Sequence, residues 1–113
     1  MNDLELADLY DKSADILEDK GWCKFTLWDE QGRVCARGAM MSAMLPSPVA
    51  DISWLRLADN PIEINIAEAD SRFAELIGVE NVATWNNLVA KDKFEVIDAF
   101  RHAAKELRND ATR

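Results

Sequence analysis

The chain has 113 residues, which is enough for one ordinary domain and too few for a second core. Hydrophobic residues make up 49% of the sequence, as is typical of a globular protein, and a formal net charge of −8 disfavours direct binding to nucleic-acid phosphates. Two cysteines and one histidine are too few for a disulfide scaffold or a tetrahedral zinc site, so we expect neither a metal nor a cofactor.

The pattern of charge and hydropathy predicts a cytoplasmic protein. No apolar run approaches the roughly 20 residues that cross a bilayer. The N-terminus carries acidic residues where a signal peptide carries basic ones followed by an apolar stretch. We therefore expect a protein that does not bind membranes.

The first expected element is a helix that begins after Asn2. Asn2 and Glu5 have the spacing of a capping box, in which each side chain accepts a hydrogen bond from the other residue's backbone. Apolar residues then recur at helical spacing as far as Leu17. Gly21 supplies a left-handed residue, so the helix should end at Lys20.

A β-hairpin is expected next, over residues 23–35. Aromatic and β-branched residues lie on both sides of a turn that ends in Gly32. In this register Cys23 and Cys35 point to opposite faces, so their thiols cannot reach disulfide distance. An exposed hairpin edge can pair with a second copy of the chain, which predicts a homodimer through strand addition.

Helices are expected for the rest of the chain, over residues 36–44, 48–57, 66–77 and 93–107. In the first of these, Gly38 and Ala39 allow close approach of another element. Residues 109–113 should fray. The sequence thus predicts an α+β fold, a helix-dominated small single domain over residues 1–108 with one β-hairpin packed against the helices.

Two stretches of the chain carry a family resemblance. They contain the motifs Gly21-Trp22-Cys23, Asp29-x-x-Gly32-Arg33-Val34-Cys35-x-x-Gly38-Ala39, Trp85-Asn86, Glu95-Val96-Ile97 and Arg101-x-Ala103-Ala104. Together they resemble a family of small uncharacterised proteins encoded by actinobacteria and their phages, a domain of unknown function. The resemblance covers most of the chain except Leu45 to Pro61, and it implies an actinobacterial or phage cytoplasm without a mechanism. Members usually have Asp where this chain has Asn87, so chemistry that depended on that Asp would be lost here.

Catalysis by a cysteine is the first candidate chemistry. Cys35 lies just before the helix over residues 36–44, whose backbone N–H groups could lower the pKa of its thiol. His102 as base and Asn86 as orienting group would complete a Cys-His-Asn arrangement. His102, however, lies off the apolar stripe of its helix and should face solvent, so a buried structural Cys35 is the better interpretation and we assign no catalytic residue.

A polar ligand site is a second candidate, formed by Trp85, Asn86 and Asn87 in the connector before the last helix. An aromatic ring beside two amides can bind a polar ligand or a peptide. The alternative is that Trp85 fills the core while an Asn side chain caps neighbouring backbone, and we favour this alternative.

A partner-binding surface is the third candidate. A small domain has difficulty burying every large side chain around the hairpin and the following helix, so we expect an exposed apolar patch formed by Trp28, Met41, Met44 and Trp54. The alternative is that these residues are core. The sequence therefore favours a non-enzymatic protein-interaction module, plausibly a phage- or prophage-encoded modulator of a host protein whose identity the residues do not specify. The alternatives are a small thiol enzyme using Cys35 and an acidic DNA mimic, in which carboxylates of the first helix and the turn line one ridge.

Overall fold

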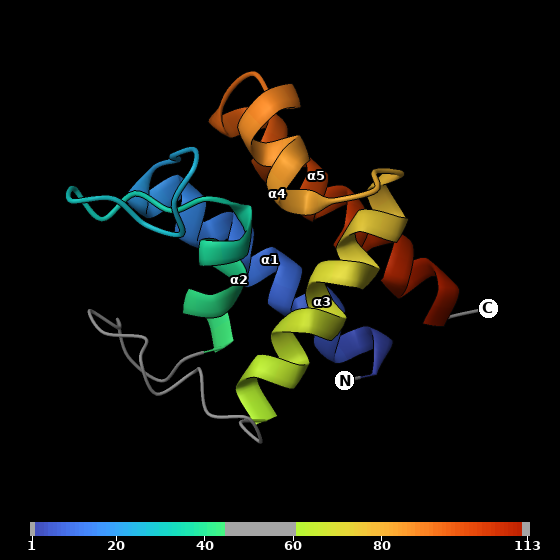
Figure 1. Ribbon diagram of the computed structural model, residues 1–113. Helices are drawn as coiled ribbons and strands as arrows, with labels where there is room; N and C mark the ends of the chain where they lie inside the picture. The colour runs from blue at the N-terminus through green and yellow to red at the C-terminus, as the bar shows by residue number, and fades with distance from the viewer. Residues whose placement is uncertain (1, 45–60, 112–113) are drawn as a thin grey trace.

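The computed structural model describes residues 2–44 and 61–111, and it describes side chains over 2–44 and 65–110 (Figure 1). Helices follow one another along the chain: α1 (Asp3–Lys20), α2 (Ala36–Met44), α3 (Pro61–Ile77), α4 (Val82–Thr84), the π-helical turn η2 (Trp85–Val89) and α5 (Lys93–Ala111). The helix expected over residues 48–57, and Trp54 with it, lie outside the described residues. Each helix among the described residues is too short or too polar to span a lipid bilayer.

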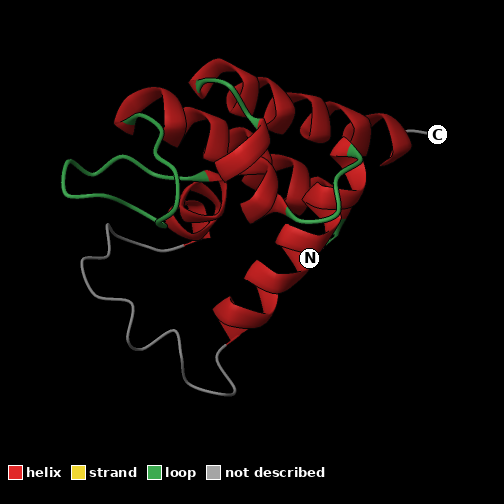
Figure 2. Cartoon of the chain, turned by 45° about the horizontal axis from the view of Figure 1, so that its top comes forward, coloured by secondary structure: helices red, strands yellow, loops and turns green. Residues whose placement is uncertain are grey.

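The fold of the described residues is all-α, so the predicted α+β class is wrong. Figure 2 shows only helices and loops in this part of the chain. The β-hairpin predicted over residues 23–35 is an irregular loop, and the edge proposed for strand addition does not exist there. Two helices also extend further than predicted: α3 begins at Pro61 and α5 continues to Ala111. Proline is well suited to the first position of a helix.

The loop does not form a hairpin because two different segments that precede Val34 both pair with this residue. Val34 is bridged to Trp22 in parallel orientation and to Trp28 in antiparallel orientation. Between these two bridges the chain reverses direction at Phe25, whose φ of 68° is a left-handed conformation that strands do not contain. Each pairing is therefore limited to an isolated bridge.

The antiparallel pair of α1 and α5 forms the largest helix interface, and α2 and α3 pack against it. An aromatic cluster lies where the helices meet. The rings of Phe73 and Phe100 stack with centroids 4.3 Å apart, and Tyr10 lies 5.4 Å from Phe73. The Tyr10 hydroxyl donates a 2.8 Å hydrogen bond to the Ala69 carbonyl, so the buried phenol has a partner.

Close approach of α2 to the loop depends on Gly38, as predicted. A Cβ atom on this residue would lie 1.9 Å from the carbonyl oxygen of Leu27, a distance that no side chain tolerates. The loop is thereby held flat against the first turn of α2.

Acidic residues of α1 form ion pairs with α5. Arg108 lies 2.9 Å from Asp8, and Arg101 lies 3.1 Å from Asp11 and 2.6 Å from Asp15. The carboxylates along this ridge of α1 are thus neutralised by arginines of the neighbouring helix. This pairing counts against the DNA-mimic interpretation, which requires a free row of negative charge.

Candidate functional site

The side chain of Asn86 joins η2 to the loop and to α2. It is 1% exposed. Its Oδ1 accepts hydrogen bonds from Trp22 Nε1 at 2.7 Å and from the Ala36 backbone N–H at 3.0 Å. Its Nδ2 donates to the Cys23 carbonyl at 3.2 Å and to Asn87 Oδ1 at 3.0 Å. Asn86 therefore uses its full hydrogen-bonding capacity within the protein and has none left for a ligand.

The neighbouring residues support this joint. Asn87 Oδ1 accepts a 2.8 Å hydrogen bond from the Phe25 backbone N–H, which fixes the loop where it reverses. Trp85 is 8% exposed and its ring meets Phe73 edge-on, with centroids 6.0 Å apart. These contacts match the interpretation of Trp85-Asn86-Asn87 in which Trp85 fills the core and an asparagine side chain caps neighbouring backbone.

The π-helical turn explains how two successive asparagines both reach the loop. The Ala90 N–H donates to the Trp85 carbonyl at 2.8 Å, five residues back. A π-turn is wider than an α-turn and rotates successive residues by a smaller angle, so Asn86 and Asn87 share one side. Leu88 and Val89 follow on the outside and are exposed.

A small pocket of about 220 Å³ lies between the loop, the start of α2 and η2. Its lining combines a thiol, a guanidinium, two amides and apolar groups, from Phe25, Thr26, Leu27, Cys35, Arg37, Ala83, Asn86 and Asn87. Pockets for drug-sized ligands are usually larger, about 300–1,000 Å³. The pocket therefore admits only a small molecule.

Cys35 caps the N-terminus of α2. Its carbonyl accepts the first helical hydrogen bond from Ala39 at 2.8 Å, and its Sγ accepts one from the Gly38 N–H at 3.3 Å. Burial raises the pKa of this thiol, and the N–H groups of α2 offset the effect only in part. The proposed catalytic partners are divided, because Asn86 lines the same pocket whereas the side chain of His102 on α5 is 57% exposed and lies 3.9 Å from Glu106.

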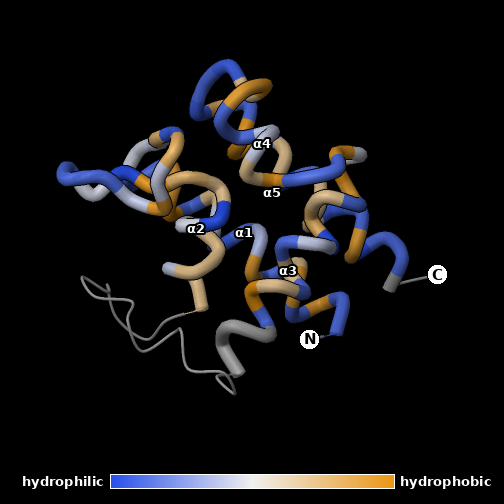
Figure 3. Tube along the Cα trace, in the orientation of Figure 1, coloured by the Kyte–Doolittle hydropathy of each residue, from blue (hydrophilic) through white to orange (hydrophobic). Residues whose placement is uncertain are grey.

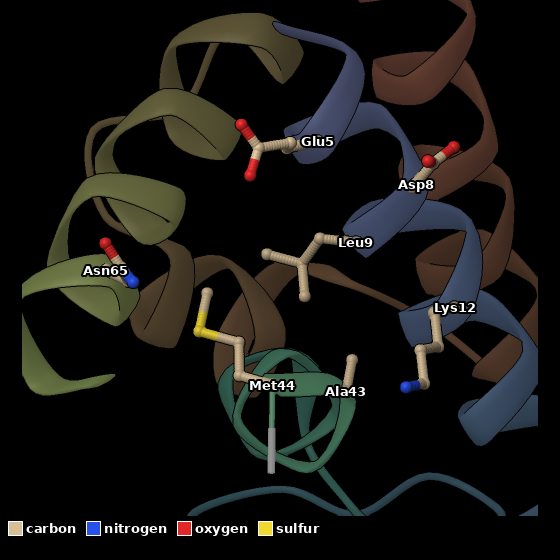
Figure 4. A pocket seen from close by; sticks show the side chains of 7 residues that line it. All are labelled: Glu5, Asp8, Leu9, Lys12, Ala43, Met44 and Asn65. Atoms are coloured by element: carbon tan, nitrogen blue, oxygen red, sulfur yellow. The ribbon is translucent and has the colours of Figure 1, made fainter. Parts of the chain in front are cut away.

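A second pocket of about 390 Å³ lies between α1, α2 and α3 (Figure 4). Figure 4 shows the side chains of Met44 and Leu9 pointing into its centre, with acidic groups at its rim. Those acids already have partners, because Glu5 accepts a 3.3 Å hydrogen bond from the backbone of Asn2 and Asp8 pairs with Arg108. Lys12 and Asn65 supply the remaining polar groups of the lining.

Three of the residues predicted to bind a partner lie in the described part of the chain, and they do not form one exposed surface. Met41 is 7% exposed and belongs to the core, together with the fully buried Met40. Met44 and Trp28 are partly buried and pack against that core. For these residues the alternative interpretation, a core segment, describes the structure better.

Other large apolar side chains are exposed on η2, at the start of α5 and on the loop that contacts η2 through Asn87. Phe25 is 73% exposed, Leu88 71%, Val89 58% and Phe94 64%, and we call these four residues the apolar end. Figure 3 shows strongly hydrophobic positions at this tip, next to hydrophilic ones. The sequence held a signal for one of them, because Phe94 lies off the apolar stripe that Val96, Ile97 and Phe100 define in the last helix.

The apolar end is flanked by lysines. Lys24 precedes Phe25 in the loop, while Lys91 and Lys93 precede Phe94. The Lys93 ammonium lies 5.2 Å from the centroid of the Phe94 ring. The nearby acids are engaged at the start of α5, where Asp92 and Glu95 each accept a hydrogen bond from the backbone. Both carboxylates keep their charge, so three lysines stand against two acids at this end of an otherwise acidic protein.

The chain belongs to the family of unknown function DUF6197, whose family model matches residues 1–106. No curated protein and no solved structure matches the chain. Among the side chains that the structure describes, no group of three or more His, Cys, Asp and Glu is placed to hold a metal ion.

Proposed function

We propose that this member of the DUF6197 family is a non-enzymatic protein-interaction module, and that its apolar end binds an acidic amphipathic segment of a partner protein. The observation that supports this proposal is the exposure of Phe25, Leu88, Val89 and Phe94 at one end of the molecule. Several large apolar side chains exposed in neighbouring elements of a small domain are candidates for an interaction site.

The lysines define the chemistry of the partner. The formal net charge of −8 repels acidic proteins in general, whereas Lys24, Lys91 and Lys93 attract acidic groups to the apolar end. A helix with an apolar face and acidic flanks would place its apolar side chains against Leu88 and Phe94. Symmetric self-association through the same surface is less favourable, because it would bring the lysines of two copies together.

The biological setting of the proposal rests on the resemblance to proteins of actinobacteria and their phages. In that setting the partner is a protein of the host cytoplasm, and the module is a phage- or prophage-encoded modulator that covers part of its surface. The thiol-enzyme alternative is not favoured, because His102, the proposed base, does not line the pocket beside Cys35.

The test compares three forms of the protein in affinity capture from an actinobacterial lysate. The Leu88→Glu, Phe94→Glu double variant alters the apolar end, and Leu4→Glu alters an apolar residue of α1 that is 55% exposed elsewhere. Circular dichroism must first show that all three are folded. We expect a partner that the wild type and Leu4→Glu capture and the double variant loses.

The lysines are tested with Lys91→Glu, Lys93→Glu. This variant should lose the same partner, and added salt should weaken capture by the wild type. Partners that bind the Leu88→Glu, Phe94→Glu variant as well as the wild type would refute the proposed surface. Absence of any specific partner would refute the interaction module itself.

A further inference from the structure

The parallel bridge between Trp22 and Val34 places two cysteines side by side. The Val34 N–H donates to the Gly21 carbonyl and the Cys23 N–H donates to the Val34 carbonyl, both at 3.0 Å. Side chains alternate between the faces of paired segments, so the residues one step before and one step after this bridge share the opposite face. Those residues are Gly21 with Arg33, and Cys23 with Cys35.

The pair before the bridge confirms this register. A Cβ atom built on Gly21 would lie 3.1 Å from Cγ of Arg33, so residues 21 and 33 are direct neighbours on that face. Paired segments lie about 4.8 Å apart. By the same register Cys23 and Cys35 are neighbours, and we expect their Cα atoms to lie within the range of roughly 4.4–6.8 Å that disulfides span.

Asn86 marks the point where the two segments separate. In a continuing parallel pair the Ala36 N–H would bond directly to the Cys23 carbonyl, but here the Asn86 amide lies between them and bonds to both. The segments therefore begin to diverge at the Cys23 carbonyl, directly after the Cys23 N–H has bonded to Val34. Both thiols are free, as the sequence predicts, but the reason given for it, a hairpin with the thiols on opposite faces, does not apply.

The two cysteines are almost equally buried, with 9% of Cys35 and 8% of Cys23 exposed, but they differ in their contact with the pocket. Cys35 lines the pocket of about 220 Å³ beside the loop, whereas Cys23 does not line it. The Cys23 thiol lies against the loop backbone, with Sγ 3.4 Å from the Arg33 carbonyl oxygen. A small molecule in the pocket therefore meets Cys35 first.

We propose that Cys23 and Cys35 form a thiol–disulfide exchange site whose substrates are small disulfides that enter this pocket. The Cys35 thiolate attacks one sulfur of the small disulfide, forms a mixed disulfide and releases one thiolate. The Cys23 thiolate then attacks Cys35 Sγ and displaces the second. The two protein thiols lose two electrons and two protons in total, and the small disulfide is reduced to two small thiols.

The surroundings make this exchange slow at neutral pH. Burial raises the pKa of Cys23 to about 11, with contributions from Cys35 and Asp29 that Arg33 partly offsets. Burial also raises the pKa of Cys35, against the N–H groups of α2 and the Arg37 charge. The reaction should therefore be run at mildly alkaline pH, where more thiolate is present. The inference is independent of the proposed partner-binding surface.

The test uses the intact, reduced protein and cystamine, a small disulfide, followed by non-reducing digestion with trypsin and mass spectrometry. Lys20, Lys24, Arg33 and Arg37 are cleavage sites, so an internal disulfide joins the peptides Gly21–Lys24 and Val34–Arg37. We expect a monomer that has lost two hydrogen atoms and contains this linked pair. Two cysteamine adducts per chain, a linkage found only in dimers, or unreacted thiols that react once the protein is unfolded would each overturn the proposal.

Single variants separate the roles of the two cysteines. Cys23→Ser retains Cys35 and should stop at one cysteamine adduct, while Cys35→Ser retains Cys23 and should stay unmodified while folded. Serine is a favourable residue before α2, so the second variant keeps a hydrogen-bond acceptor for the helix. Equal modification of the two variants would overturn entry through Cys35.

Discussion

Replacement of Asn86 by alanine tests the joint between η2, the loop and α2. The change removes the partners of Trp22 Nε1, the Ala36 N–H and the Cys23 carbonyl. Each buried polar group left without a partner costs about 1–3 kcal/mol. Trp22 is only partly buried, so water can reach its Nε1 and the sum is smaller. We expect a loss of about 3–5 kcal/mol in the free energy of unfolding.

The loss is measurable by urea unfolding followed by circular dichroism. A domain of this size has about 5–15 kcal/mol of stability, so the midpoint should fall by a large fraction at an unchanged slope. Asn87→Ala is the matched control, because it removes hydrogen bonds that are at most partly buried and should cost about 1 kcal/mol. If Asn86→Ala cost no more than this control, the assignment of Asn86 as the buried joint would be incorrect.

Three further changes test other parts of the fold. Gly38→Ala should lower the free energy of unfolding by more than about 3 kcal/mol, because its Cβ would meet a backbone oxygen at 1.9 Å. In the control Gly32→Ala, the new Cβ meets nothing within 4 Å, so this variant should lose only about 1 kcal/mol for its left-handed φ of 81°. Urea unfolding compares the two variants. Burial alone would raise the pKa of Asp11, but hydrogen bonds from two arginines of α5 hold it below its usual value. The ion pairs therefore stabilise the fold above the ordinary carboxyl pKa of about 4, and this stabilisation is lost as the pH falls through the lower pKa of Asp11 in the folded protein. The free energy of unfolding of Arg108→Met should accordingly fall less steeply at acidic pH than that of the wild type. Tyr10→Phe removes a buried hydrogen bond and should cost about 1–2 kcal/mol. Since burial raises the pKa of Tyr10, the wild type should lose stability as pH rises above about 10, and the Phe variant should lose less.

Helix ends were predictable because the signals that set them are local. The Asn2 and Glu5 capping box forms as predicted, with hydrogen bonds of 2.8 and 3.3 Å, and Gly21 ends α1 with a φ of 91°. Asp92 likewise caps the last helix through the N–H of Glu95. Each of these interactions joins residues within four positions of one another or depends on one backbone conformation.

The loop was not predictable, because distant residues determine its shape. Trp22 and Phe25 are held by Asn86 and Asn87, which lie 64 and 62 residues further along the chain. The period-two pattern of residues 23–28 favours a strand, but it contains no information about these amides. The two bonds are part of a set that holds an irregular backbone where a hairpin would otherwise be expected.

The candidate site was predictable in part. The sequence singled out Trp85, Asn86 and Asn87, and the structural interpretation of them describes the observed contacts. Met41 is buried rather than exposed, and methionines at helical spacing such as Met41 and Met44 cannot be distinguished from core without knowing how α1 and α3 cover α2. The proximity of the two cysteines depends on a parallel pairing that no local rule predicts.

Synthesis of this chain on the ribosome must reach α5 before the fold can close. Asp11 and Arg101, which join α1 to α5, are 90 residues apart in sequence. An isolated helix of the length of α1 is marginal in water, so its apolar stripe stays without a stable partner until α5 is made. Chaperones would therefore meet an unfolded chain for most of the time that the ribosome takes to make it. A truncation within α5 would accordingly yield a substrate for proteases rather than a smaller folded domain.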